Sequence, residues 1–426
     1  MKKVLSLVLA VCLLLTVLSV ASADPVSLKY SDWSAVDESW TACYDALFAQ
    51  FDNDMGAEID LDVGGNAYAD TLNQLLIQAG GGNPPDIAKI KTEWLPQFLA
   101  MGVLADLTEY IPEEMAKDFY EGSLDSYKYE GGLYALPYFS QGYAVFYNKD
   151  LLAQAGITEL PKTFDEMIED AYKISALGSD ADGNTIYGIA IPGSGTQNAE
   201  GYNIFPWLWA NGGDFKDAEG NIALNTEENI KSFSQIQKLY LDNVSPLGLT
   251  FNECRNLFGT GDLGFYWDLM SQTSSFTKSS VLGDEYLNHI SAFVIPSNGE
   301  AAGVGYNTES IFVVFNTCKD VAAAVKVIDY LSGVTGQTVL AEYGKGKMST
   351  RASVMDAIYS NVTDEITLAY IDAMASNHAL PFADQYFMEA DLAIGRALTR
   401  LAMNEDTATV INELQSEVVD IYAGNN

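Results

Sequence analysis

Aromatic residues stand beside acidic residues at the ends of predicted strands. Trp33 directly follows Ser31 and Asp32 after one apolar strand, and Trp267 precedes Asp268 at the end of another. Aromatic rings stack on the apolar C–H patches of sugars, while carboxylates accept hydrogen bonds from sugar hydroxyl groups. This combination predicts a binding site for a polyhydroxylated ligand.

Three more aromatic residues stand at comparable positions. Tyr68 opens a predicted helix, Trp207 lies just before an Asn-Gly-Gly turn, and Tyr306 lies in a glycine-rich stretch. Packing in a core is the commoner role of any single aromatic residue. Trp33 and Trp267 fit that role least, because each adjoins an aspartate at a strand end.

Motifs for metal and nucleotide chemistry fail on spacing. The stretch 180–184 is similar to a calcium loop, but Thr185 stands where an EF-hand needs glycine. The segment 344–347 lacks the first glycine and the final Ser or Thr of a phosphate-binding loop. His289 and His378, the two histidines, have no ligand cluster near them in the sequence, so a zinc site or histidine triad is not expected. We therefore expect no metal and no cofactor.

The composition restricts the ligand and the partners. The formal net charge is −36, from 58 acidic and 22 basic residues, and only four of the basic residues are arginines. A surface this acidic repels nucleic acid and anionic lipid, and it disfavours a phosphate or sulfate ligand. Two alternatives to sugar binding remain open. A carboxylate-rich cleft would suit a cation such as a polyamine, and a secreted carbohydrate hydrolase with paired carboxylates cannot be recognised by spacing.

The first 23 residues are typical of a secretory signal peptide. Lys2 and Lys3 precede an apolar run over 4–20, and Ala21-Ser22-Ala23 supplies the small residues of a cleavage site before Asp24. The run is short for a membrane anchor, which needs about 20 apolar residues. Cys12 lies inside the run and not directly after it, so we expect an exported product without a lipid anchor.

The remaining cysteines are Cys43, Cys254 and Cys318. An odd number at such long spacings allows at most one disulfide, and small buried side chains are the simpler interpretation.

The elements that must position these residues alternate between strands and helices. Strands are predicted at 26–30, 59–63 and 86–90, with helices at 40–51, 68–79 and 93–101. This β-α-β-α-β-α order indicates a parallel sheet with helices on both faces. From residue 133 the pattern is richer in strands, and a helical tail begins near residue 363. About 400 residues exceed one hydrophobic core and predict two domains.

An ordered series of short motifs covers nearly the whole chain after residue 24. They are the segments 82–87 (GNPPDI), 98–107 (FLAMGVLADL), 132–137 (GLYALP), 146–152 (FYNKDLL), 161–166 (PKTFDE), 258–267 and 303–306. In the fifth, Thr163 is expected to cap a helix, with Glu166 at the third helical position. The series resembles the solute-binding proteins of ABC importers, in the family that includes maltose-binding protein.

The resemblance implies a two-lobed α/β protein with a ligand cleft between the lobes. The first lobe would comprise residues 24–137 plus 304–347, and the second 142–303 plus 348–426, with hinge strands near 137–143 and 303–309. It further implies a monomer that captures a di- or oligosaccharide by lobe closure and delivers it to an ABC-type permease, without catalysis.

By motif position, the resemblance implies a set of ligand contacts from both lobes. Arg351 is included although Thr350 stands where the family usually has proline. The implied contacts are Ser31, Asp32, Trp33, Tyr68, Glu93, Tyr138, Gln141, Trp207, Trp267, Asp268, Tyr306 and Arg351.

Overall fold

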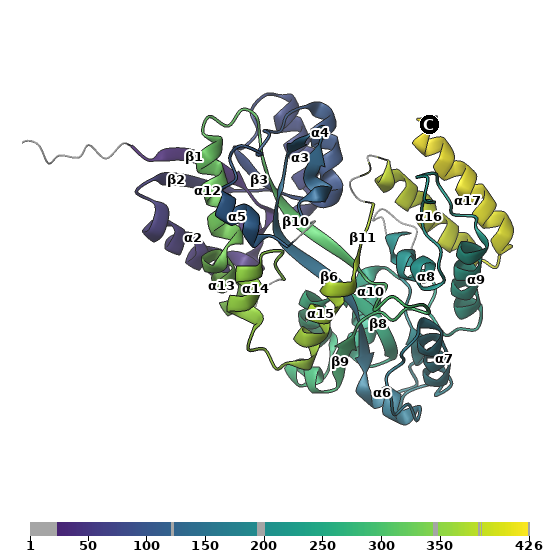
Figure 1. Cartoon of the computed structure of the whole chain (residues 1–426). Coiled ribbons are helices and arrows are strands. Elements are labelled where there is room, and N and C mark those ends of the chain that lie inside the picture. Colours follow the sequence, from purple (N-terminus) through teal and green to yellow (C-terminus); the bar gives the residue numbers. More distant parts are fainter. Residues whose placement is uncertain are drawn as a thin grey trace, which may run out of the picture.

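The computed structural model describes residues 24–120, 123–193, 201–343, 348–381, 384 and 386–424. The predicted signal peptide lies outside these ranges. Figure 1 shows two bodies side by side, which we call the first lobe and the second lobe, joined by long strands. Within the described ranges, no helix is long and apolar enough to span a membrane.

The first lobe is built on three parallel strands. They are β1 (Val26–Ser31), β2 (Ile59–Gly64) and β3 (Ile87–Lys91), paired in the order β2-β1-β3. The helices between them are α2 (Thr41–Met55) and α3 (Tyr68–Gly80), and α4 (Leu95–Met101) follows β3. The β-α-β-α-β-α order predicted from the sequence is confirmed.

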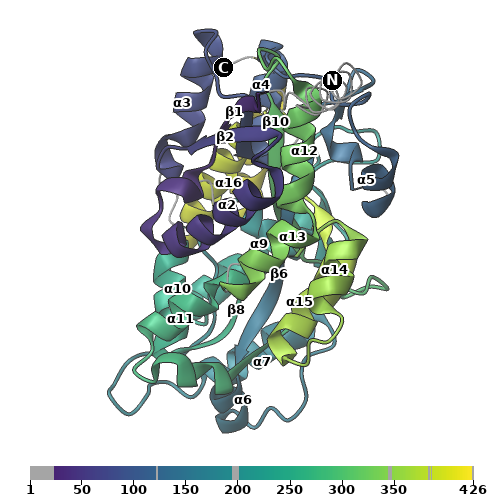
Figure 2. The same ribbon diagram turned by 90° about the vertical axis from the view of Figure 1, so that its left-hand side faces the viewer.

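Helices cover both faces of this sheet. Figures 1 and 2 show α2 and α12 (Val321–Ser332) on one side of the strands, and α3 and α4 on the other. Alternate side chains of β1, such as Leu28 and Tyr30, are buried in one cluster with Phe51 of α2, Leu75 of α3 and Ile328 of α12. The short helices α5 (Glu113–Asp118) and α13 (Val334–Glu342) complete this lobe.

The second lobe surrounds the strands β7 (Tyr187–Ile189), β8 (Leu263–Leu269) and β9 (Ile290–Phe293). Thr163 caps α7 through the reciprocal bonds with Glu166 expected from the sequence. The helical tail is confirmed. The helices of this lobe are α6 (Lys149–Gln154), α7 (Phe164–Ser175), α8 (Phe205–Ala210), α9 (Glu227–Leu241), α10 (Phe251–Thr260), α11 (Thr273–Ser279), α15 (Glu365–Ser376), α16 (Phe387–Ala402) and α17 (Thr407–Tyr422).

Two antiparallel strands run through both lobes. β6 (Leu136–Asn148) pairs with β10 (Tyr306–Val314) over its first half, and with β8 and β9 over its second half. Phe139 and Ile311 are buried in the first-lobe cluster, while Tyr143 and Tyr306 are buried in a second-lobe cluster. The change of core therefore falls between Phe139 and Tyr143 and between Tyr306 and Ile311. These intervals overlap the strands 137–143 and 303–309, whose role as a hinge stays a prediction.

The segment that follows the first lobe contacts both lobes. Met348 packs in a second-lobe cluster, whereas Arg351 pairs with Asp118 of α5 and Asp329 of α12. The helix α14 (Ala352–Tyr359) comes next and lies beside α13. The predicted lobe limits stay a prediction. The limit at residues 347 and 348 falls in this segment, which contacts both lobes.

Asn377 ties the two long strands together where they cross. Its Nδ2 donates to the carbonyl oxygens of Tyr143 (3.3 Å) and Tyr306 (2.9 Å) and to Oδ1 of Asn307 (3.0 Å). The next residues form β11 (His378–Ala379), which pairs with the start of β10. Gly305 has no side chain to obstruct this contact, since a Cβ there would lie 2.0 Å from Oδ1 of Asn377. Three chain segments therefore meet at one point.

We expect Gly305→Ala to destabilise the protein by about 1–3 kcal/mol, because the added methyl group overpacks this junction. Asn377→Ala should also destabilise, since it removes the Nδ2 group, whose two N–H donors are shared among three acceptors. In the double variant the total loss should be smaller than the sum, because Asn377→Ala removes the closest collision, at 2.0 Å, and leaves the Tyr143 carbonyl oxygen at 2.9 Å.

Urea unfolding measures these changes, with Gly299→Ala as the matched control. A Cβ at Gly299 meets only Ser297 Oγ, at 3.6 Å, so this control should change stability by less than about 0.5 kcal/mol. Strictly additive losses in the double variant would contradict the proposed steric contact.

Candidate ligand-binding site

Three aromatic rings gather at one edge of the first-lobe sheet. Trp33 lies 5.4 Å from Tyr68 and 5.8 Å from Trp94 between ring centroids, and Tyr68 lies 5.7 Å from Trp94. Trp94 is buried and Trp33 is half-buried, whereas Tyr68 is 54% exposed. We call these three residues the aromatic cluster. It offers a ring surface that a ligand can reach.

The parallel strands explain why these rings meet. Trp33 follows β1, Trp94 follows β3, and Tyr68 opens the helix that follows β2. The carboxyl ends of parallel strands share one edge of a sheet, which is where ligands bind in open α/β folds. Trp94 was missed from the sequence, although it adjoins Glu93 and so repeats the pattern of an aromatic residue beside a carboxylate.

A buried ion pair lies against the Trp33 ring of the aromatic cluster. Asp32 pairs with Lys89 of β3, and both side chains are almost completely buried. Asp32 also accepts hydrogen bonds from the hydroxyl groups of Tyr30 (2.6 Å) and Tyr44 and from the Ser34 amide (2.8 Å). Lys89 Nζ lies 3.9 Å from the centre of the Trp33 ring. This network holds Trp33 in place and already occupies the Asp32 carboxylate.

Burial also affects Lys89 itself. It lowers the pKa of Lys89 to about 8, although the neighbouring Asp32 charge acts in the opposite direction. Desolvation disfavours an ammonium group, and a carboxylate within contact distance restores part of its charged form.

Two carboxyl groups lie near the cluster and the long strands. Oε2 of Glu93 is buried and has no hydrogen-bond partner among the described residues, and burial raises the pKa of this side chain. Glu309 lies on β10 opposite Ser140 of β6. Burial raises the pKa of Glu309 to about 7, with Lys91 opposing the shift. Both groups can receive a hydrogen bond from a ligand.

The second lobe contributes a group of tyrosines beside the crossing strands. Tyr143 stacks on Tyr306 at 4.2 Å, and Tyr202 lies 5.6 Å from Tyr306. The Tyr306 hydroxyl donates to Asn203 Oδ1 at 3.0 Å. Burial raises the pKa of Tyr202, and the neighbouring Tyr143 adds to that increase. Tyr143 and Tyr202 were missed from the sequence, because neither adjoins an acidic residue.

Asp268 and Arg351 are both engaged in ion pairs. Asp268 receives two bonds from Arg255, at 2.7 and 3.1 Å, and is fully buried. Arg351 contacts Asp118 and Asp329, each at 2.7 Å. These pairs fix local structure.

Trp207, Trp267 and Tyr138 lie in the cores. Both tryptophans are 0% exposed, and their ring centroids are 5.8 Å apart. The ring of Phe164 lies 4.8 Å from Trp207. Tyr138 is 2% exposed and lies 4.4 Å from Phe312. The structure thus gives these three side chains a packing role, and their contact with a ligand stays a prediction.

The two remaining implied contacts lie on strands. Gln141 is half-buried on β6, opposite Thr308 of β10. Ser31 ends β1 and faces a small pocket. The structure therefore brings Ser31, Trp33, Tyr68 and Glu93 together in the first lobe, whereas Trp207 and Trp267 are buried in the second-lobe cluster.

The cysteines are also placed. Cys43, Cys254 and Cys318 are all buried, and no disulfide joins cysteines in the described part of the chain.

Comparison with known proteins places the chain in a family. The model of the bacterial extracellular solute-binding proteins matches residues 38–338, well over half of the chain. The chain belongs to this family. It is a family of binding proteins and not of enzymes, so the hydrolase alternative is set aside.

Relatives of this solute-binding protein match over part of their length. A binding protein of Brucella abortus is 27% identical over 263 residues, 61% of each chain, so the match spans about three-fifths of that relative. The diacetylchitobiose-binding protein DasA of Streptomyces coelicolor is 38% identical over 105 residues, 25% of this chain and 24% of its own. A maltotriose-binding protein of Pyrococcus abyssi is 29% identical over 188 residues, 44% of this chain and 37% of its own.

Solved structures confirm the fold. The sugar-binding protein MalE of Xanthomonas citri superposes with a TM-score of 0.78, covering 94% of this chain and 98% of its own at 20% identity. The GacH receptor of Streptomyces glaucescens superposes with a TM-score of 0.75, covering 93% of this chain and 97% of its own, also at 20% identity. The solute-binding protein therefore has the mixed α/β periplasmic-binding-protein fold predicted from its sequence.

Truncation of Trp267 tests its packing role. We expect Trp267→Ala to destabilise the protein by about 3–5 kcal/mol, because it empties a fully buried site next to Trp207 and Phe164. Trp267→Phe keeps part of the side-chain volume, so it should lose clearly less stability than Trp267→Ala. Urea unfolding of both variants checks this, and a loss below about 1 kcal/mol in Trp267→Ala would show that the ring is not a core element.

Titration of Glu309 should make stability depend on pH. Its pKa is about 7 in the folded protein, against a reference value of 4.5, so the folded state holds the proton more tightly. The contribution of Glu309 to the free energy of unfolding is fully present below pH 4.5, where its carboxyl group is protonated, and it is lost as the pH rises towards 7. Each pKa unit corresponds to about 1.4 kcal/mol. We compare the free energy of unfolding of wild type with that of Glu309→Gln. Allowing for partial solvent screening, the wild-type value should fall relative to the variant by about 1–3 kcal/mol as the pH rises from 4.5 to 7.

Unfolding curves at pH 4.5, 6 and 7.5 measure that difference. The exposed Glu300→Gln variant is the matched control and should follow wild type at every pH. Parallel curves for wild type and Glu309→Gln would mean that Glu309 ionises normally.

Proposed function

We propose that this protein captures a sugar, a di- or oligosaccharide, between its lobes outside the cytoplasm and delivers it to an ABC-type permease. The observation that carries the proposal is the aromatic cluster, whose Tyr68 ring is 54% exposed beside the unpartnered Glu93 oxygen. Binding needs no cofactor.

The chemistry of the cluster suits a sugar. An exposed ring offers a flat apolar face for C–H groups, and Glu93 accepts hydroxyl hydrogen bonds at the edge of that face. Although Tyr68 is 54% exposed, desolvation of its phenol group raises the pKa to about 12, with a smaller contribution from Glu93, so the hydroxyl stays a neutral donor and acceptor at ordinary pH. The names of the Streptomyces and Pyrococcus relatives also refer to oligosaccharides, which supports this ligand class.

Closure of the lobes is the proposed mode of capture. The ligand would contact the aromatic cluster on the first lobe and the tyrosines near Tyr202 on the second. A ligand that touches both lobes favours the closed arrangement by its differential affinity. The hinge would lie in β6 and β10, over 137–143 and 303–309, and the lobes would be 24–137 plus 304–347 and 142–303 plus 348–426.

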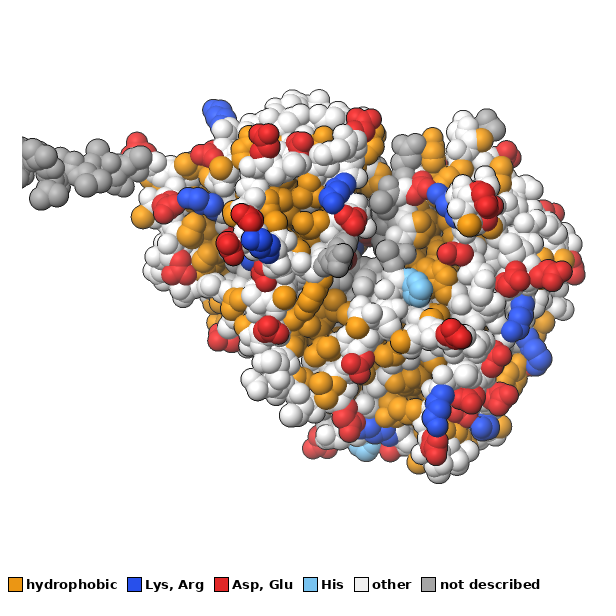
Figure 3. All heavy atoms as spheres, viewed as in Figure 1, with side chains coloured by type: hydrophobic (Ala, Val, Ile, Leu, Met, Phe, Trp, Pro, Cys, Tyr) orange, Lys and Arg blue, Asp and Glu red, His pale blue; other side chains and the backbone are white. Residues whose placement is uncertain are grey.

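The surface charge supports the proposed setting. Acidic side chains are spread over both lobes in the view of Figure 3, with few basic ones between them. Such a surface keeps a protein soluble and apart from nucleic acid and anionic lipid. We propose that residues 1–23 are a signal peptide that directs export and is removed. The exported protein would then be a monomer without a lipid anchor.

A cationic solute such as a polyamine is the second candidate. Glu93 and Glu309 favour it, because two buried carboxyl groups near the cluster would gain most from a positive charge. A thermal-shift panel separates the two classes, with maltotriose, diacetylchitobiose and galacto- and arabino-oligosaccharides set against spermidine and putrescine. A ligand at about 100 times its dissociation constant stabilises by about 2.7 kcal/mol. Stabilisation by polyamines alone would overturn the sugar proposal.

Tyr68→Ala tests the cluster directly. Losing an exposed stacking ring should weaken binding of the best sugar in the panel by about 1–2 kcal/mol, or roughly 5- to 30-fold. Tyr110→Ala is the matched control, since Tyr110 is a 44% exposed tyrosine of the same lobe outside the cluster. Isothermal calorimetry should give the control an unchanged affinity. Equal affinities for wild type and Tyr68→Ala would remove this ring from the site.

A further inference from the structure

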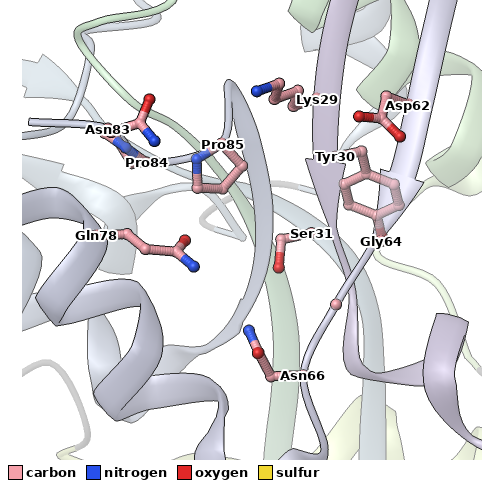
Figure 4. Close-up of a pocket in the computed structure, with 11 residues that line it drawn as sticks. Lys29, Tyr30, Ser31, Asp62, Gly64, Asn66, Gln78, Asn83, Pro84 and Pro85 are labelled. Atoms are coloured by element: carbon pink, nitrogen blue, oxygen red, sulfur yellow. The ribbon is translucent and has the colours of Figure 1, made fainter.

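The first lobe has a polar pocket next to the aromatic cluster. Its volume is about 300 Å³, and it lies between the outer edge of the sheet and the end of α3. Figure 4 shows the polar side chains of β1, β2, α3 and the loop before β3 around one space. We call it the amide pocket, because Asn66, Gln78 and Asn83 supply three primary amides to its wall.

Strand register builds the floor of the amide pocket. The parallel pairing of β1 with β2 sets Lys29 opposite Asp62 and Ser31 opposite Gly64. Since alternate residues of a strand share a face, these four positions lie on one side of the sheet. Gly64 contributes no side chain, which leaves the floor open between Ser31 and the surrounding loops.

The polar side chains of the pocket are available to a ligand. Lys29, Ser31, Asp62, Asn66, Gln78 and Asn83 make no side-chain hydrogen bond or ion pair with any other residue that the structure describes. Each primary amide both donates and accepts, as does the Ser31 hydroxyl. One lysine and one aspartate balance each other in charge. The lining therefore suits a neutral molecule with several hydroxyl groups.

The amide pocket adjoins the aromatic cluster along the chain. Ser31 lies two residues before Trp33, and Asn66 lies two residues before Tyr68. Its volume is at the lower limit of the ~300–1,000 Å³ common for small-molecule sites, which fits a single ring better than a chain.

We propose that the amide pocket is a subsite for one further neutral sugar unit of an oligosaccharide whose neighbouring unit stacks on Tyr68. The inference rests on the proposed sugar binding and adds a determinant of chain length. Gly64 is then the specificity-determining position, because any side chain at that position occupies the subsite. A Cβ built on Gly64 meets no atom within 4 Å, so the backbone tolerates the change.

Gly64→Val fills the pocket without straining the strand, since valine is favoured in strands. The probes are the di-, tri- and tetrasaccharide of the series that binds wild type best in the thermal-shift panel. Wild type should bind at least one longer probe more tightly than the disaccharide. In Gly64→Val that gain should disappear, with affinity for the longer probe at least tenfold weaker and affinity for the disaccharide within twofold of wild type.

Two further variants separate loss of the subsite from general damage. Gly299→Val adds the same side chain at an exposed loop of the second lobe and should bind all probes as wild type does. Gln78→Ala with Asn83→Ala should weaken only the longer probe, whereas Asn73→Ala, at an exposed position on another face of the same helix, should not.

The outcomes distinguish the two proposals. If no sugar in the panel binds wild type, sugar binding itself is refuted and the subsite with it. If wild type binds sugars but gains nothing from chain length, or Gly64→Val keeps the gain, the subsite alone is refuted. Should Gly64→Val weaken the disaccharide as much as the longer probe, the pocket belongs to the main site and is not an additional one.

Discussion

The antiparallel pairing of β6 with β10 is the constraint on which the rest of the structure depends. Asn307 pairs with Gly142 at one end and Phe312 with Leu136 at the other, so the two strands carry the chain between lobes as one ladder. A register shift next to Ser310 and Ile311 interrupts that ladder close to the change of core. Backbone bonds must be kept in both lobes, so the proposed lobe closure would have to take place in the few residues between the cores.

The candidate site follows from the first-lobe end of this ladder. Pairing of β10 with β3 fixes Lys89, and Lys89 in turn lies between Asp32 and the Trp33 ring. A buried charge pair is costly to dehydrate, and removing one partner leaves the other uncompensated. The tyrosine hydroxyl groups around Asp32 offset part of that cost. The position of Trp33 is thus set by chain segments far apart in the sequence.

Much of the fold could be predicted because it depends on local patterns. The first-lobe strands and helices follow apolar periodicity, and the Thr163 cap follows a four-residue motif. The site was harder to predict, because burial depends on distant partners. Trp267 adjoins an aspartate at a strand end as Trp33 does, yet Trp207 and Phe164 enclose it, and Arg255 engages Asp268. The amide pocket depends on the register of β1 with β2, which no single segment of sequence reveals.

Lobe closure on a bound sugar is the central claim, and an interlobe distance tests it most directly. Ile77 of α3 and Val419 of α17 are exposed on different lobes and suit spin labels after substitution by cysteine, since the native cysteines are buried. Pulsed electron paramagnetic resonance would compare the distance distribution without ligand and with the best-binding sugar at saturation. The account predicts a shift to a shorter, narrower distribution with sugar. An unchanged distribution, at an occupancy that calorimetry shows to be complete, would contradict it.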